Sequence, residues 1–203
     1  MRRTKAEAAL TRQAILRSAL AVFSTRGYAS ATLDDVARLA GVTRGAIYWH
    51  FDGKAGLFQA LLETYSTRVT EIFASGANEN GEFTEVLTRL VERVLEAVET
   101  DRGVQAVAEL ALFKTENLPE LRSVQRHQAE AANLLLQSVT ATLRRGVGAG
   151  SLRPDVPVEA AARVLLGMIN GILHQWLLSP RSFSLREAAQ PLSRIFLHGL
   201  ARP

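Results

Sequence analysis

The segment from Thr43 to Lys54 concentrates side chains that can hydrogen-bond and carry charge. Arg44 can donate two parallel N–H groups to the O6 and N7 atoms of guanine, or it can bind a phosphate. Gly45 has no side chain and so permits close approach of the backbone to a duplex. This combination predicts contacts to double-stranded DNA, with the candidate residues being Thr32, Thr43, Arg44, Gly45, Tyr48, Trp49, His50 and Lys54.

The spacing of small and apolar residues in this region predicts a helix-turn-helix. Ala37 is small where a second helix would cross, Gly41 tolerates the positive φ of a tight turn, and Ile47 points an apolar side chain back inward. Thr32 and Asp35 have the spacing of a capping box at the start of the first of these helices. Two short helices joined by glycine also occur in proteins that never bind DNA, so the spacing alone leaves that alternative open.

The aromatic residues of the second helix divide by their expected position. Helical spacing places Tyr48 beside Arg44, so we expect Tyr48 to be exposed. We expect Phe51 to pack against the first helix. Trp49 fits either packing or contact with DNA.

Positive charge is concentrated at the start of the chain. Residues 1–54 contain nine lysines and arginines and four acidic residues, a balance of +5, whereas the whole chain has a net charge of +4. A basic first quarter on a neutral remainder is typical of a small anion-binding head, although a solvated basic surface without a partner would look the same.

Residue types exclude several other chemistries. The chain of 203 residues has no cysteine, and its four histidines lack the spacing of metal ligands. The glycine-rich run 146–150 follows a predicted helix and lacks the lysine of a phosphate-binding loop. We expect no metal, no cofactor and no catalysis. Residues 162–178 form the longest apolar stretch, which polar residues interrupt, and no signal peptide is recognisable, so we expect a cytoplasmic protein without a membrane span.

Helical periodicity runs through almost the whole sequence and predicts an all-α fold of about nine helices. The first helix is expected at 7–26, with Leu10, Ile15 and Phe23 on one face and Gly27 as its stop. The others are expected at 33–41, 43–51, 53–75, 83–99, 103–115, 119–146, 157–179 and 185–200. We expect a DNA-binding head at 1–54 and an effector-binding and dimerisation domain at 55–203.

Polar residues that interrupt apolar helices predict a small-molecule pocket in the second domain. Each of these polar side chains could equally be hydrogen-bonded within the core or exposed to solvent. The candidate ligand-binding residues are Leu62, Tyr65, Phe73, Leu87, Glu109, Leu112, Phe113, Leu134, Gln137, Asn170 and His174.

The helix at 157–179 is apolar on more than one face, which predicts burial on more than one side. The small residues Gly167 and Gly171 would let a partner helix approach closely. The alternative is an internal helix of a monomer. The candidate dimer-interface residues are Leu165, Gly167, Met168, Gly171, Trp176, Leu192 and Phe196.

Residues Thr32 to Lys54 resemble the DNA-binding head of the TetR family of bacterial transcriptional regulators, and are especially similar to the AcrR branch, which controls multidrug efflux pumps. The similarity extends to residues 3–7, 11–16 and 171–183. It implies a homodimer with two heads, an effector pocket in each body, and release from operator DNA on effector binding. Ser66 stands where the AcrR branch has an acidic residue facing cationic drugs, and joins the candidate ligand-binding residues.

We therefore expect a homodimeric repressor that a small apolar or amphipathic effector releases from a pseudo-palindromic operator. Its two 43–50 helices would enter successive major grooves, about 34–36 Å apart. Arg2, Arg3 and Lys5 would follow the DNA backbone or the adjacent minor groove. The alternatives are a regulator of another pathway such as lipid metabolism, a DNA-binding protein without an effector, and a helical enzyme.

Overall fold

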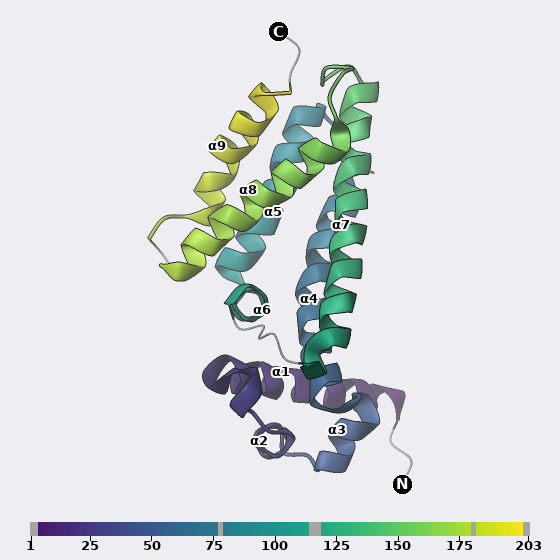
Figure 1. Ribbon diagram of the computed structural model, residues 1–203, viewed down its shortest axis with the longest axis vertical. Helices are drawn as coiled ribbons and strands as arrows, with labels where there is room; N and C mark the ends of the chain where they lie inside the picture. Colours follow the sequence, from purple (N-terminus) through teal and green to yellow (C-terminus); the bar gives the residue numbers. More distant parts are fainter. Residues whose placement is uncertain (1–3, 77–78, 114–118, 180–181, 201–203) are drawn as a thin grey trace. The chain divides into compact units, whose positions relative to one another are not determined.

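The computed structural model describes residues 4–76, 79–113, 119–179 and 182–200, and these residues form helices without any strand (Figure 1). The all-α prediction is confirmed. The described part contains nine α-helices: α1 (Lys5–Ser30), α2 (Leu33–Ala40), α3 (Arg44–His50), α4 (Gly53–Ser75), α5 (Phe83–Thr100), α6 (Arg102–Phe113), α7 (Arg122–Gly148), α8 (Val158–Leu178) and α9 (Leu185–His198). A 3₁₀ turn, Pro119–Leu121, precedes α7.

The chain forms two compact units whose boundaries differ from the expected division at residue 54. The first unit comprises Met1–Tyr65 and Ala106–Ala129, and the second comprises Ser66–Gln105 and Glu130–Pro203. Burial explains why the later segment belongs to the first unit. Val107, Leu110, Leu121 and Val124 lie in the same core as the buried residues of α1 and α4.

The core of the first unit contains a cluster of aromatic rings. Phe23 of α1 lies 5.8 Å from the ring of Tyr28 and 5.3 Å from that of Phe58, measured between centroids. Gly27 interrupts the helical backbone at φ 73°, close to the expected stop, but one further turn carries Tyr28 into the core. Leu10, by contrast, is 66% exposed, because the buried face of α1 begins only at Ile15.

A second contact of Tyr28 joins the two sequence segments of the first unit. Its hydroxyl donates a hydrogen bond to the carboxylate of Glu120. Burial, together with the Glu120 charge, raises the pKa of Tyr28. The contact fastens the 3₁₀ turn before α7 to α1.

The core of the second unit is organised around α5. The apolar residues of α5 follow helical spacing and bury one face, with Leu87, Leu90 and Leu95 fully inaccessible. Helix α9 packs along α5 and lies beside α8 (Figure 1). At the end of this packing, the Glu99 carboxylate accepts hydrogen bonds from the Ser184 hydroxyl at 3.3 Å and the Arg186 backbone N–H at 2.9 Å. These contacts fix the start of α9 on the end of α5.

Candidate DNA-binding surface and effector region

The positions predicted to build the helix-turn-helix have the expected roles. Gly41 ends α2 in the left-handed conformation at φ 65°, a backbone region in which a side chain is strained. Ala37 and Ile47 are buried, and Ile47 has no accessible surface. The hydroxyl oxygen of Thr43 caps α3 by accepting the Ala46 N–H at 3.2 Å. Ile47 therefore packs α3 against the head, and Arg44, Gly45, Tyr48 and Trp49 are exposed.

Arg44 and Tyr48 lie together on the outward face of α3. An Arg44 Nη atom donates to the Tyr48 hydroxyl at 3.1 Å, and the guanidinium lies 5.6 Å from the centre of the tyrosine ring. The hydrogen bond to Tyr48 raises the pKa of Arg44, and the Asp34 carboxylate contributes in the same direction. Asp34 pairs with the other Nη at 3.4 Å. Sequence reasoning placed Tyr48 beside Arg44 but did not identify Asp34.

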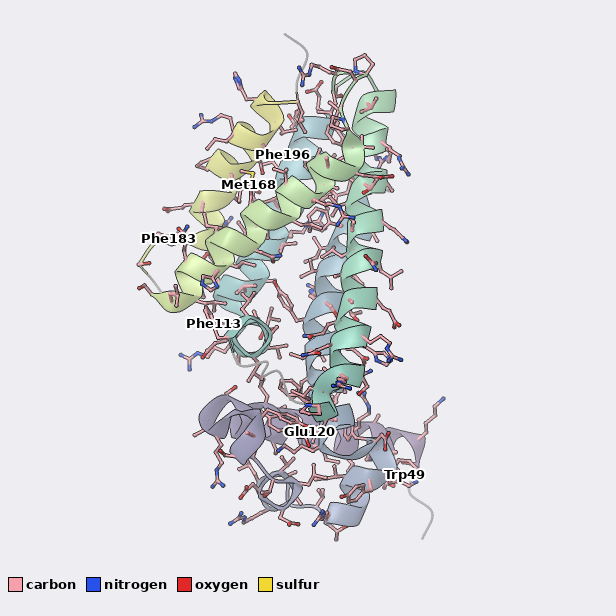
Figure 2. All side chains as sticks on the ribbon, in the orientation of Figure 1. Trp49, Phe113, Glu120, Met168, Phe183 and Phe196 are labelled. Carbon is pink, nitrogen blue, oxygen red and sulfur yellow. The ribbon has the colours of Figure 1, made fainter. Side chains whose placement is uncertain are left out.

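The aromatic residues after Tyr48 have contrasting environments. The Trp49 side chain is 74% exposed and projects from α3 into solvent (Figure 2). The half-buried His50 ring packs edge-on against it at 4.5 Å. Phe51 is buried, as expected, beneath the Arg12 guanidinium of α1 at 5.1 Å. Trp49 is therefore available to a partner.

Two of the predicted DNA-binding residues form contacts inside the head. The Thr32 hydroxyl accepts the Asp35 backbone N–H at 3.1 Å and donates to the Asp35 carboxylate at 2.7 Å, so its one hydrogen is already used. The Lys54 ammonium donates to the Ala29 carbonyl at 3.1 Å and lies 4.3 Å from the centre of the Tyr28 ring. Both residues have a structural function that residue type alone does not reveal.

Asp35 neutralises part of the positive charge of the head. It pairs with Arg26 at 3.0 Å and also with Arg38. The hydrogen bond from Thr32 lowers the pKa of the Asp35 carboxyl, and the two arginines act in the same direction. The balance of +5 already counts the Asp35 charge, and the pairs show that Arg26 and Arg38 are the arginines it engages within the head. Lys5 is exposed in the first turn of α1, and Arg2 and Arg3 lie outside the described residues.

The candidate ligand-binding residues are distributed over both units. In the first unit, Leu62 is buried and Tyr65 and Glu109 are half-buried. Burial raises the pKa of Tyr65 to about 12. Leu112 and Phe113 are each 38% exposed. Phe113 lies at the end of α6 (Figure 2).

In the second unit, Phe73 and Leu87 are buried core residues and Ser66 is half-buried. The remaining candidates, Leu134, Gln137, Asn170 and His174, lie on the surface of α7 and α8. The spacing of polar and apolar residues therefore did not separate core side chains from surface side chains.

Two clefts of the second unit are lined by residues that sequence reasoning did not select for a ligand. One, of about 720 Å³, is lined by Glu99, Thr100, Arg102, Gln105, Trp176, Phe183 and Ser184. The other, of about 470 Å³, lies between α4 and α5 and is lined by Arg68, Glu71, Ile72, Ser75, Arg93, Glu96, Ala97 and Thr100. Both clefts combine charged and apolar side chains.

The predicted interface residues divide into buried and outward-facing groups. Leu165, Trp176, Leu192 and Phe196 are buried within the unit, and the Trp176 indole donates to the Phe183 carbonyl at 3.0 Å. They are occupied by their own chain because α8 packs its larger apolar face inward. Gly167 and Gly171 are exposed and Met168 is half-buried, so an interface on α8 would lie on their side of the helix.

Other features of the described residues limit the chemistry of the site. No three histidine or acidic side chains among them are grouped so that they could hold a metal ion. None of the described helices has the length and apolarity needed to cross a membrane.

Comparison with known proteins identifies the family. Residues 15–61 match the family model of bacterial regulatory proteins of the tetR family, and residues 83–201 match that of the C-terminal region of MAATS-type transcriptional repressors. The chain is 36% identical over 200 residues to the HTH-type transcriptional regulator AcrR of Shigella flexneri, covering 97% of this chain and 92% of that protein. It is 34% identical to the transcriptional regulator TtgR of Pseudomonas putida, over 91% of this chain and 89% of that protein.

A solved structure with the same fold supports this assignment. NalD, the secondary repressor of the MexAB-OprM multidrug efflux pump in Pseudomonas aeruginosa, superposes with a TM-score of 0.81 at 29% identity, over 96% of this chain and 98% of that one. The two family matches together cover the helix-turn-helix and most of the second unit. The chain therefore belongs to the TetR family of bacterial transcriptional regulators, with the C-terminal region of the MAATS-type repressors.

Proposed function

We propose that the chain is a ligand-responsive repressor that binds double-stranded operator DNA through α3, as a homodimer in the cytoplasm. The outward face of α3 carries this proposal. Ile47 is the buried residue of α3, and Arg44, Tyr48 and Trp49 are exposed. A short exposed helix that is polar at its start is the geometry with which helix-turn-helix proteins enter a major groove.

The side chains at the start of α3 suit both base and phosphate contacts. Thr43 accepts the capping hydrogen bond, so its own hydroxyl hydrogen remains for a phosphate oxygen. Tyr48 accepts from Arg44, which similarly leaves its hydroxyl hydrogen for a donor role. Arg44 then reads a guanine edge or contacts the backbone. Neither Thr32 nor Lys54 is needed for this surface.

A homodimer would place two such helices on one operator. The outer face of α8 presents Val164, Gly167, Gly171 and Leu178 at helical spacing, with Val164 55% and Leu178 64% exposed. A side chain added at either glycine would meet no atom of its own chain within 4 Å, which leaves room for a partner helix. Ile195 of α9 adds a further exposed apolar side chain. Burial of about 800 Å² per protomer would make this interface stable.

Effector binding would be transmitted through the helices that contribute to both units. Helix α4 is continuous from Gly53 to Ser75, so a displacement of its later turns moves the residues packed in the head. Helix α6 carries Phe113 into the first unit. An effector that prefers one arrangement of these helices by about 1–3 kcal/mol would lower operator affinity about 5–150-fold.

The proposed targets are multidrug efflux genes, because NalD, whose structure aligns along almost the whole chain, represses an efflux pump. Ser66 replaces the acidic residue that the AcrR-like pattern places on the fourth helix. We therefore propose neutral or amphipathic effectors in preference to cationic ones.

The test begins with selection of duplexes from a random library by the full-length protein. Fluorescence anisotropy then measures affinity for the selected duplex at increasing salt, and sedimentation measures the oligomeric state. We expect a dimer, a preferred pseudo-palindromic sequence and a steep loss of affinity with salt. A monomer without sequence preference would refute the proposal.

The effector is tested on the same complex with 1-naphthol, decanoate and tetraphenylphosphonium as neutral, anionic and cationic apolar probes. Release of the duplex by the first two at lower concentration than by the cation supports the proposed effector class. Affinity unchanged by every apolar compound would favour a DNA-binding protein without an effector. If the selected sequence lies beside genes of lipid metabolism and not beside efflux genes, lipid metabolism would replace efflux as the proposed regulated pathway.

A further inference from the structure

Arg44 is held from two sides in the free head. One Nη atom pairs with the Asp34 carboxylate of α2 at 3.4 Å, and the other donates to the Tyr48 hydroxyl of α3 at 3.1 Å. The side chains of Arg44 and Asp34 remain 54% and 66% accessible. An acidic group therefore stands on the surface that would face the DNA, next to the arginine that would read it.

Asp34 is not needed for the folding of α2. The capping hydrogen bonds of this helix are made by Thr32 and Asp35, and Asp35 also pairs with Arg26 and Arg38. Asp34 lies in the first turn, where its charge is favourable, but its ion pair is made with α3. Its contact thus acts on the proposed recognition helix.

The Asp34–Arg44 ion pair affects contacts to phosphates and contacts to base edges differently. A phosphate that binds Arg44 displaces the Asp34 carboxylate and brings two negative groups close together, which costs free energy on any DNA sequence. A guanine edge is neutral and accepts from two parallel N–H groups, and a guanidinium has five N–H donors. Arg44 can therefore approach guanine with part of its donor set while one Nη atom stays on Asp34.

We infer that Asp34 is a specificity-determining residue, which pairs with Arg44 and so lowers the affinity for DNA of arbitrary sequence more than the affinity for the operator. This inference rests on the proposed function. Asp34 acts through Arg44 as a positioning residue and makes no contact with a base. The effect is present in both heads of a dimer.

The test compares wild type with Asp34→Asn, which keeps the shape of the side chain and removes its charge. Anisotropy titrations use two duplexes of roughly 24 base pairs, about two helical turns, one selected from a random library by the wild-type protein and one of scrambled sequence, at several salt concentrations. We expect the Asp34→Asn variant to bind the scrambled duplex about three- to tenfold more tightly and the selected duplex with a smaller change. The salt dependence for the scrambled duplex should become steeper, by about 0.9 in the log–log slope for each phosphate that Arg44 gains.

Two further variants make the comparison specific. Asp34→Glu keeps the charge and should restore the wild-type affinity ratio. Asp155→Asn removes the acid of another exposed aspartate–arginine pair, that with Arg153 at 3.9 Å in the second unit, and should leave the ratio unchanged. Circular dichroism melting checks that each variant folds, and Asp34→Ser replaces Asp34→Asn if that variant does not.

The outcomes separate the inference from the function on which it rests. An unchanged ratio of affinities in folded Asp34→Asn, with wild type still preferring its selected duplex, would overturn the inference alone. Equal changes on both duplexes would do the same, because they would indicate general repulsion without discrimination. Failure of wild type to select any sequence would overturn the proposed function and the inference with it.

Discussion

Replacement of Lys54 by methionine distinguishes a structural lysine from a DNA-binding one. The Lys54 ammonium donates to the Ala29 carbonyl at 3.1 Å and lies 4.3 Å from the centre of the Tyr28 ring. The carbonyl is close to the end of α1, where a cation is favourable. Methionine keeps most of the apolar stem and removes the charge and the hydrogen bond. We therefore expect the variant to weaken the attachment of α1 to α4.

The magnitude follows from the two contacts. A hydrogen bond that involves a charged group contributes about 1.5–3 kcal/mol, and a cation–π contact at a partly exposed site contributes about 0.5–2 kcal/mol. One half-buried ammonium makes both, so they overlap and the methionine restores some packing. We expect the free energy of unfolding to fall by about 1–2 kcal/mol, which lowers the urea midpoint by roughly 0.5 M.

The assay combines urea unfolding, followed by circular dichroism, with anisotropy titrations of the selected duplex at several salt concentrations. Lys5→Met is the matched control, because Lys5 is an exposed lysine in the first turn of α1, the helix that Lys54 contacts. We expect Lys54→Met to lose stability and keep the salt slope, and Lys5→Met to keep its stability. A Lys54→Met protein of unchanged stability, whose slope falls by about 0.9 per head, would refute the structural assignment of Lys54.

Three further predictions test other contacts. Arg44→Ala should abolish sequence preference in a mobility-shift titration and leave a folded dimer, whereas retained preference would contradict the assignment of the recognition residue. The hydrogen bond from Thr32 holds the pKa of Asp35 in the folded protein below the unfolded value of about 3.9. The ionised Asp35 therefore stabilises the fold above that unfolded pKa, and this stabilisation is lost as the pH falls through the folded-state pKa. Acid unfolding should therefore be shallower in Asp35→Asn than in wild type, and equal pH profiles would count against this role. Gly146→Ala places a Cβ 2.6 Å from the Phe83 ring and should lower the melting temperature, with a loss of stability of about 1–3 kcal/mol. Gly148→Ala is the control, because its Cβ would meet no atom within 4 Å. Equal melting temperatures of the two variants would contradict the predicted clash with the Phe83 ring.

The helix-turn-helix was predictable because its determinants are local. Ala37, Gly41 and Ile47 lie within eleven positions of each other, and each role depends on side-chain size or backbone conformation at that position. Caps and glycines also placed the helices, although α1 ends at Ser30 and not at the expected residue 26. Residue type could not show that the hydroxyl hydrogen of Thr32 is used in its own cap, or that the ammonium of Lys54 is used on Ala29, which is 25 residues away.

Long-range packing was the part that sequence reasoning could not supply. The contribution of residues 106–129 to the first unit depends on contacts between segments separated by more than forty positions. A helix that is apolar on two sides, such as α8, does not reveal which side its own chain covers. Leu165 and Trp176 proved to be core residues for this reason, and the outward side instead presents Gly167 and Gly171.

Hydroxyl-radical footprinting of the selected duplex tests the central claim, that α3 is the DNA-reading element of a symmetric dimer. We expect the protein to protect two segments whose centres are about 10–10.5 base pairs apart, or a multiple of this, because two copies of α3 would enter grooves on one face of the DNA. Methylation of guanine N7 within each segment should interfere with binding of wild type and not with the residual binding of Arg44→Ala. A single protected segment, or interference that persists when Arg44 is absent, would contradict the claim.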